Sequence, residues 1–342
     1  MRSSAASSPS AGWGCPVGDS PEQAALRDAV RSLVSRGGAD LWKRLTAELG
    51  VTGLAVPEEY GGAGATLAEV AVAVEETGRV LLPLPVLSTA LAGLVLGASS
   101  GCGEFLPGIA DGSLRAAFVF ADSVTVSSGL VHGAAAHVLD GVEADLFVVR
   151  AGAELHVVRA SDVEVAPAET LDQSRSQATV FFPEAAAVAV PDADPAVAEE
   201  LLRVLLAVES VGAAAHCLDV TVAYLRTREQ FGRALGTFQA LRHRCADLAV
   251  LVASARATVY AAVSGATDSE LLVQGPLAKK YCADVFWQVA AEMIQLHGGI
   301  GFTWEHEAHR YLKRAKTTQL LHGSPTELRR LVAERAGLLT SA

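Results

Sequence analysis

The stretch QLHGGIGFT, from Gln295 to Thr303, directly follows a helix-like apolar run, Val285 to Leu296, near the end of the chain. A helix that ends in paired glycines leaves bare backbone, which a ligand can approach closely. Gly298 and Gly299 are therefore candidate ligand-contacting residues. They do not form a dinucleotide fingerprint of the Rossmann type, because no strand precedes them.

The composition is that of an acidic chain, long enough for two or three domains with a substantial core. Its 342 residues include 27 Lys and Arg against 38 Asp and Glu, a net charge of -11. That balance disfavours nucleic acid as the main partner. The five cysteines are scattered and lack a CxxC spacing, which argues for a reducing cytoplasm and against a disulfide frame or a zinc site.

Two segments resemble a membrane span or a secretory signal in part, but neither has the required pattern. Val80 to Gly103 is the longest apolar stretch without a charge, but Pro83, Pro85 and a Ser/Gly-rich end interrupt it. We therefore expect a buried helix there and not a membrane span. Residues 1–20 are rich in Ser, Ala and Gly, with one basic residue and no apolar core. We expect a disordered lead there and not a secretory signal.

The first two thirds of the chain change from helical to strand-like patterns. Residues 21–110 show helical spacing in the segments 22–35, 41–49, 66–77 (with Thr66 as N-cap and Gly78 as stop) and 84–96. Residues 111–193 contain short β-rich runs at 117–120, 146–149, 156–158 and 179–182, which Gly, Asp and Pro separate. Such runs predict a small antiparallel barrel or sandwich.

Residues 194–342 return to helical spacing and predict an antiparallel four-helix bundle. One buried stripe of a long helix has apolar residues at steps of three and four, namely Leu241, Cys245, Leu248, Val252, Ala255 and Val259. The segments 201–225 and 283–296 behave in the same way. The predicted fold class is therefore α+β, with an N-terminal helical domain, a central β-domain and a C-terminal helical bundle.

Three segments, in the order of the chain, resemble the acyl-CoA dehydrogenase family. They are 54–64 with its PEEYGG loop, 224–247 (YLRTREQFGRALGTFQALRHRCAD) and 295–315 (QLHGGIGFTWEHEAHRYLKRA). The order of helices, strands and helices agrees with this fold independently. The resemblance implies an FAD-dependent desaturation of an acyl-CoA thioester, in fatty acid or sterol catabolism, with an electron-transfer flavoprotein as acceptor.

The resemblance also implies that FAD binds between subunits, so that the chain forms an oligomer. Arg228 would reach the FAD pyrophosphate of a neighbouring subunit, because a guanidinium offers fixed, paired donors to phosphate. Gln295 and Gly299 would contact the adenosine end. The full set of cofactor residues that it implies is Arg228, Gln230, Phe231, Gln295, Gly298, Gly299 and Ser324. A basic group around Arg228 (Arg226, Arg233, Arg242, His243 and Arg244) is either a solvated helix face or part of a phosphate site.

The chain departs from the family where a carboxylate would remove the α-proton of the thioester, with the β-hydrogen leaving as hydride to flavin N5. His322-Gly323-Ser324 stands where many members have Glu-Gly-Thr, and Leu202 occupies the alternative position of the base. Glu209 lies in an otherwise apolar helix segment nearby, which is costly unless the carboxylate is paired or functional. Glu209 is the first candidate base; the alternative is an ion pair with a buried Arg such as Arg203. His322 is the second candidate, and its alternative is a satisfied histidine at a helix end.

The central domain departs as well. The family's Thr-Glu-Pro strand and Trp-Ile-Thr-Asn turn correspond here to residues 120–122 and 137–140, which lack the aromatic wall and the hydroxyl. Degenerate members of this kind form one half of heteromeric α2β2 dehydrogenases, and the segment 170–175 resembles their smaller subunits. Three alternatives remain: a homo-oligomeric enzyme, a non-catalytic subunit that completes a paralogue's FAD site, and a member acting on a carrier-bound acyl group in biosynthesis. His306 and His309 invite a metal site, but no third ligand is evident, so we expect none.

Overall fold

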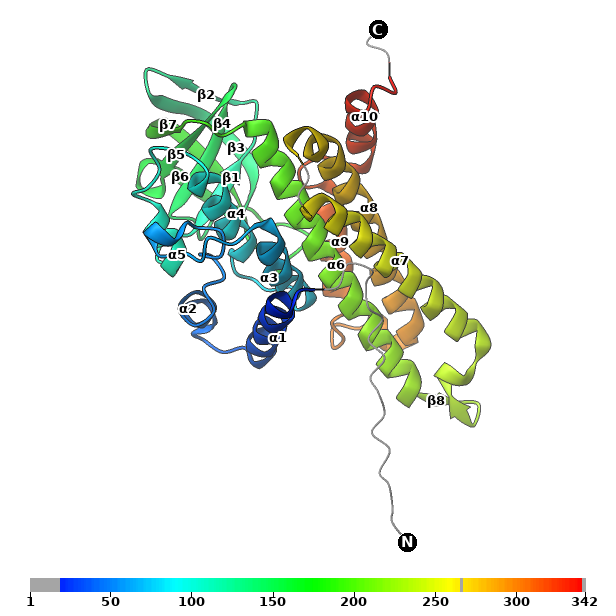
Figure 1. Cartoon of the computed structure of the whole chain (residues 1–342). Helices are drawn as coiled ribbons and strands as arrows, with labels where there is room; N and C mark the ends of the chain where they lie inside the picture. Colours follow the sequence, from blue (N-terminus) through cyan, green and yellow to red (C-terminus); the bar gives the residue numbers. More distant parts are fainter. Residues whose placement is uncertain (1–18, 265–266, 340–342) are drawn as a thin grey trace.

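The computed structural model describes residues 19–264 and 267–339. It has a group of N-terminal helices, a curled sheet and a bundle of long helices, in that order along the chain (Figure 1). The predicted order of helices, strands and helices is thus confirmed. Most of the predicted disordered lead, residues 1–18, lies outside the described residues.

Two of the N-terminal helices begin at polar caps, and the predicted N-cap at Thr66 is confirmed. Ser20 and Thr66 each form a capping box, with Gln23 and Glu69 respectively. The predicted stop at Gly78 is wrong by one residue, because the helix continues to Arg79. The five helices are α1 (Pro21–Arg36), α2 (Leu41–Ala47), α3 (Leu67–Arg79), α4 (Val86–Gly97) and α5 (Leu106–Asp111). The sequence pattern did not predict α5.

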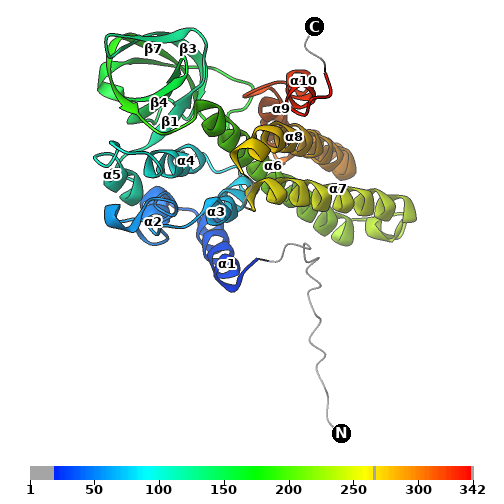
Figure 2. The ribbon, with the colours of Figure 1, turned by 45° about the horizontal axis from the view of Figure 1, so that its top comes forward.

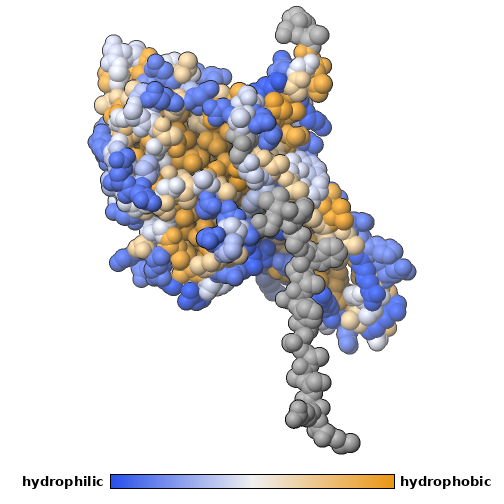
Figure 3. Space-filling model, in the orientation of Figure 1, coloured by the Kyte–Doolittle hydropathy of each residue, from blue (hydrophilic) through white to orange (hydrophobic). Residues whose placement is uncertain are grey.

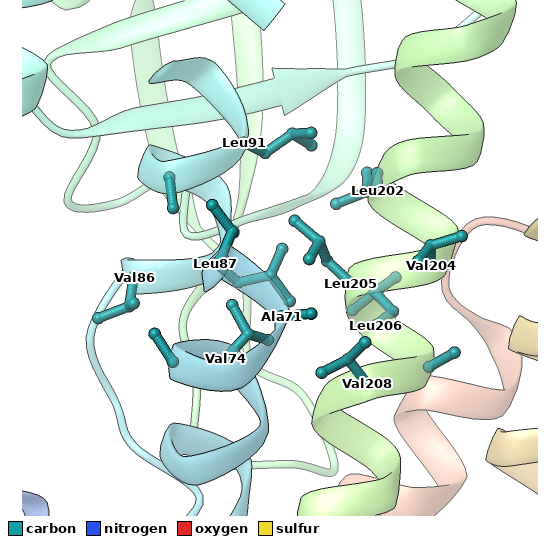
Figure 4. Packing of buried hydrophobic residues seen from close by; sticks show 14 of the residues in the cluster. Ala71, Val74, Val86, Leu87, Leu91, Leu202, Val204, Leu205, Leu206 and Val208 are labelled. Atoms are coloured by element: carbon teal, nitrogen blue, oxygen red, sulfur yellow. The ribbon is translucent and has the colours of Figure 1, made fainter. Parts of the chain in front are cut away.

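The main core lies where α3 and α4 face α6 (Pro195–Thr227). Apolar side chains of α3 and α4, such as Val74 and Leu91, point toward Leu202 and Leu205 on α6 (Figure 4). α3 and α6 approach so closely that a Cβ on Gly212 would lie 1.9 Å from the carbonyl oxygen of Glu75. Glycine at this crossing lets the two backbones touch, so the N-terminal helices dock firmly on the bundle.

The central domain is a seven-stranded sheet that curls into a barrel (Figure 2). The strands are β1 (Ala116–Val119), β2 (Val124–Ser127), β3 (Leu130–Leu139), β4 (Leu146–Ala151), β5 (Glu154–Arg159), β6 (Glu164–Pro167) and β7 (Gln177–Val190). The prediction of an antiparallel sheet needs one correction, because β1 pairs with β4 in parallel. The sequence pattern did not predict β2, β3 and β6. Several of their residues are exposed or are Gly or Ala, which weakens the alternation of apolar and polar side chains that marks a strand.

The bundle contains α6, α7 (Gln239–Val263), α8 (Asp268–His297), α9 (Ala308–Leu320) and α10 (Pro325–Arg335). The predicted stripe on α7 is buried at Leu248, Val252, Ala255 and Val259, whereas Leu241 and Cys245 are half-buried. A two-strand hairpin of β8 (Glu229–Gln230) and β9 (Arg233–Ala234) joins α6 to α7. It lies at the far end of the bundle from the barrel (Figure 1).

Among the described residues, α6 and α7 are long and apolar enough to cross a membrane by length and composition alone. Most of the apolar window of α6 is buried inside the protein, as expected of a core helix. The apolar segment 80–103 forms the buried helix α4, which has 12 residues. On the face shown in Figure 3, hydrophobic residues gather where the barrel meets the helices.

Candidate functional site

The far end of the bundle brings together the two motifs that hold Arg228 and Gln295. Tyr224, in the last turn of α6, stacks on His297, the last residue of α8, with 4.4 Å between ring centroids. Its hydroxyl also donates to the carbonyl oxygen of His297 over 3.3 Å. This contact joins the C-terminal ends of α6 and α8. The predicted cofactor residues on the two helices therefore share one end of the molecule.

Arg228 has a fixed backbone and a free side chain. Its N–H donates to the carbonyl oxygen of Tyr224, and its own carbonyl oxygen accepts from the N–H of Leu235, both over 2.8 Å. Its exposed guanidinium forms no ion pair within residues 19–264 and 267–339. By contrast, Arg242 donates to the carbonyl oxygen of Gly236 and Arg244 pairs with Glu292. The guanidinium of Arg228 is therefore free for a phosphate, and Arg226 and Arg233 likewise form no ion pair within the described residues.

The same end exposes aromatic rings and bare backbone. Phe231 is 88% exposed, and Phe302 and Trp304 are 86% and 78% exposed. Gly298 adopts a left-handed conformation at the end of α8, and Gln295, Gly298 and Gly299 are all exposed. Large exposed aromatic side chains mark surfaces that a ligand or a partner covers. A free guanidinium, an amide and open glycine backbone fit the phosphate and adenosine parts of a dinucleotide.

A cavity of about 610 Å³ lies where the barrel meets the bundle. Phe120 and His137 line it from the barrel, and Arg203, Leu320 and His322 line it from the bundle. His137 has a positive φ of 57° and stands where β3 shifts its register against β7. A bulge of this kind re-aims a side chain beside a site. The cavity has the size of a typical small-molecule site, and it contains the family position that His322 replaces.

His322 is a neutral group in this cavity. Burial, together with the positive charges of Arg203, Lys279 and Arg175, lowers the pKa of its imidazole to about 3. Its Nε2 atom is shielded from solvent and has no hydrogen-bond partner among the described residues. The ring meets Phe120 edge-on, with 6.2 Å between centroids. Because its conjugate acid is this strong, His322 is a weak proton acceptor at neutral pH.

Glu209 lies in a buried network of charges. Its carboxylate accepts hydrogen bonds from Arg175, in the loop before β7, and from Arg314 on α9, the latter over 3.2 Å. Arg314 also donates to Asp172 over 2.6 Å. These side chains are at most 9% exposed. Removal of the Glu209 carboxylate would leave two buried arginines undercompensated, which is costly.

The alternative interpretation of Glu209, an ion pair with a buried arginine, therefore fits its surroundings, but Arg203 is not the partner. Arg203 pairs instead with Glu199 over 2.5 Å and with Glu200. Glu209 is also absent from the lining of the cavity that holds His322. The two candidate bases of this chain thus do not share one site.

The remaining candidate residues have local structural partners. Ser324 caps α10, and its hydroxyl accepts from the N–H of Glu327 over 3.4 Å. Asp140 accepts from the hydroxyl of Ser88 on α4 over 2.5 Å, so this turn binds the N-terminal helices. Burial raises the pKa of Asp140 to about 6. Among the described residues, no group of three His, Cys, Asp or Glu side chains could hold a metal ion.

The cations that surround these groups have a role that the sequence did not predict. Arg175, Arg314 and Lys279 are at most 9% exposed. Arg314 and Lys279 lie on buried helix faces, and Arg175 ends the segment 170–175, whose resemblance to smaller subunits implied no role for this residue. A charged residue within an apolar helical stripe indicates a paired or functional group, because an unpaired charge would be costly there. The sequence does not show which residue pairs with it, since Arg175 and Arg314 lie 34 and 105 positions from Glu209.

The chain matches known proteins along most of its length. Residues 20–113 match the model of the acyl-CoA dehydrogenase N-terminal domain, and residues 200–337 match that of its C-terminal domain. Acyl-CoA dehydrogenase IpdE2 of Mycolicibacterium smegmatis is 39% identical over 92% of this chain and 94% of its own length. Acyl-CoA dehydrogenase FadE34 of Mycobacterium tuberculosis is 35% identical over 91% of this chain, but over 45% of its own length.

Solved structures agree with the sequence relatives. A steroid acyl-CoA dehydrogenase, the Tcur3481-Tcur3483 G363A variant, superposes with a TM-score of 0.84 at 27% identity, over 93% of this chain and 98% of its own. The ChsE4-ChsE5 complex of Mycobacterium tuberculosis shares the fold, with a TM-score of 0.85 at 24% identity, over 94% of this chain and 99% of that chain. The chain belongs to the acyl-CoA dehydrogenase family.

Proposed function

We propose that this chain is one subunit of a heteromeric, FAD-dependent acyl-CoA dehydrogenase. Its bundle end completes the FAD site of a paralogous partner, and its own cavity does not remove the α-proton of the substrate. The observation that carries this proposal is the state of the two candidate bases. Glu209 is held by two buried arginines, and the imidazole of His322 has a pKa of about 3.

At the bundle end, the proposed FAD contacts are exposed polar side chains, open glycine backbone and the ring of Phe231. Arg228 offers paired donors to the pyrophosphate, and Gln230 and Phe231 lie on the hairpin beside it. Gln295, Gly298 and Gly299 would hold the adenosine end. Bound flavin would supply the hydride acceptor, and this chain would orient its dinucleotide part. A shared site of this kind requires an oligomer, so we propose that the bundle end lies at a subunit interface.

The substrate in this proposal is an acyl-CoA thioester with a bulky apolar acyl group derived from a sterol. One structural relative supports this acyl group, because it is a steroid acyl-CoA dehydrogenase. The names of two relatives, Tcur3481-Tcur3483 and ChsE4-ChsE5, each join two components, which supports the heteromer. An electron-transfer flavoprotein would then accept the electrons. The four described cysteines are free thiols, which is in keeping with the proposed cytoplasmic location.

A second candidate function is a dehydrogenase that uses His322 as its own base. One observation favours it: the shielded Nε2 atom of His322 has no hydrogen-bond partner in the part of the chain that the structure describes, and it lies beside a cavity of about 610 Å³. A bound substrate that supplies a negative charge would raise the pKa of this imidazole. Glu209 does not line the cavity, so it is a weaker choice than His322 for this role.

The experiment that separates the two functions uses the chain co-expressed with a paralogous partner. Glu209→Gln and His322→Ala are compared with the unmodified complex by flavin bleaching under anaerobic conditions, with a panel of fatty and steroid acyl-CoA thioesters. The proposal expects bleaching to persist in both variants, because the base belongs to the partner. Loss of bleaching in His322→Ala, with flavin still bound, would assign catalysis to this chain.

A further inference from the structure

The turn that holds His322 joins α9 to α10, and its backbone adopts an unfavourable conformation. His322 has a φ of 52° and Gly323 has a φ of 111°. Left-handed backbone is unfavourable for a non-glycine residue and persists only where the surroundings fix it. A Cβ on Gly323 would also lie 2.7 Å from the Leu328 side chain. The turn therefore needs external contacts that hold it in place.

Those contacts come from two buried cations on other helices. Lys279 on α8 donates from Nζ to the carbonyl oxygen of Gln319 over 3.0 Å and to that of Gly323 over 2.6 Å. Arg203 on α6 donates from Nε to the carbonyl oxygen of His322 over 2.9 Å. Lys279 is 1% exposed and Arg203 is 7% exposed. Three hydrogen bonds from basic side chains thus fix the main chain on both sides of the imidazole.

We propose that Lys279 and Arg203 are positioning residues that clamp residues 319–323 and thereby hold the imidazole of His322 at the cavity between the barrel and the bundle. This proposal rests on the proposed function only in one respect, namely that the cavity is the place where the substrate would bind. The clamp contacts main-chain carbonyl oxygens, so it fixes the turn whichever side chain stands at position 322.

The electrostatics of the clamp agree with its geometry. Burial lowers the pKa of Lys279 to about 7, with Arg203 acting in the same direction and Asp284 and Glu327 opposing it. Lys279 and Arg203 are in turn among the cations that lower the pKa of His322. The carboxylates of Glu199 and Glu200 compensate Arg203. The clamp therefore keeps His322 both in place and uncharged.

The test uses the full chain in complex with its partner, and it compares Lys279→Met with Lys280→Met. Lys280 is the next residue on α8, and its partly exposed side chain pairs with Asp284 and donates to no carbonyl oxygen of the turn, so it is a control for the loss of a lysine at this point of the helix. Hydrogen exchange of the backbone amides of residues 321–324 is measured by mass spectrometry. Lys279→Met removes the two hydrogen bonds that Nζ donates to the turn. The amides of residues 321–324 should therefore exchange about tenfold to a hundredfold faster in this variant alone, and exchange in β7 should be unchanged.

A second readout separates positioning from stability. The imidazole signal of His322, identified by its loss in His322→Gln, is followed by NMR as the pH falls. It stays neutral in the unmodified protein and in Lys280→Met. In Lys279→Met, its pKa moves toward the ordinary value of about 6.5, because the turn admits water and a cation is gone. A general loss of stability would not move this signal selectively.

The outcomes decide the proposal without any assay of flavin or activity, so its failure is distinct from failure of the proposed function. Equal exchange and equal His322 titration in Lys279→Met and Lys280→Met would overturn the clamp. If Lys279→Met does not fold, Lys279→Gln serves in its place, because it keeps one donor on a shorter, neutral side chain. Faster exchange confined to residues 321–324 in that variant supports the clamp, and unchanged exchange overturns it.

Discussion

The exposed end of the bundle and the cavity beside the barrel treat their polar groups in opposite ways. At the bundle end, Arg228 has no carboxylate partner in the described chain, and Gln295 and Phe231 face solvent. Beside the cavity, Arg203 is paired with two carboxylates, and Glu209 is held by two arginines. Free groups are available to bind a ligand, whereas groups bonded to one another stabilise the fold. The contrast points to a chain that contributes to a cofactor site at one end and carries no ready base at the other.

The largest expected effect concerns Glu209. If it stabilises the fold, Glu209→Gln should lower the free energy of unfolding by about 3–5 kcal/mol, because one partner of a buried ion pair is lost. The control is Glu292→Gln, which removes the partner of the more exposed Arg244 and should cost less than about 1 kcal/mol. Urea unfolding of the two variants measures the difference. If Glu209→Gln and Glu292→Gln have equal free energies of unfolding, the conclusion that Glu209 stabilises the fold is contradicted.

Next in size is a pH effect at Asp140, which links the cavity turn to α4. Its pKa is raised from 3.8 to about 6 by burial, so the folded state binds its proton more tightly than the unfolded state. Stability from this group is present below pH 3.8 and is lost as the pH rises through about 6. Asp140→Asn should therefore stabilise the protein at pH 8 by up to about 3 kcal/mol. The gain should vanish near pH 4, and unfolding at both pH values checks this; a gain independent of pH would contradict it.

Arg228→Ala tests the bundle end. Loss of one charge-assisted contact to phosphate should weaken flavin binding by about 1.5–3 kcal/mol, or roughly 10- to 150-fold. The unfolding free energy of the chain alone should stay unchanged, since Arg228 makes no ion pair in the described chain. Arg226→Ala, two residues earlier and also exposed, is the matched control. Unchanged flavin content in Arg228→Ala would remove this residue from the site.

The smallest effect is expected at Phe231, which is 88% exposed. Phe231→Ala should change the unfolding free energy of the chain by less than about 0.5 kcal/mol, because the ring packs on little of its own chain. It should nevertheless weaken assembly with the partner, as measured by light scattering across a dilution series. A destabilised chain with unaltered assembly would show that Phe231 serves the fold and not the interface.

The sequence predicts the fold better than the site because periodicity is a local signal. The stripe on α7 and the cap at Thr66 depend on residues within one or two turns. The parallel pairing of β1 with β4 depends on segments about thirty residues apart, and alternation within each strand says nothing about direction. The motifs place Arg228 and Gln295 at one end. The partners of Glu209 come from distant segments of the chain. The sequence alone therefore shows only a lone carboxylate in a helix, which is equally consistent with a catalytic base and with an ion pair.

The central claim is that the chain lends its bundle end to a partner's flavin. The most direct test is the visible flavin absorbance of the purified protein, recorded together with its mass by light scattering. The chain expressed alone should be colourless, and the same chain co-expressed with a paralogous subunit should purify as a yellow heteromer. A stable species of monomer mass that retains flavin when the chain is expressed alone would contradict the account.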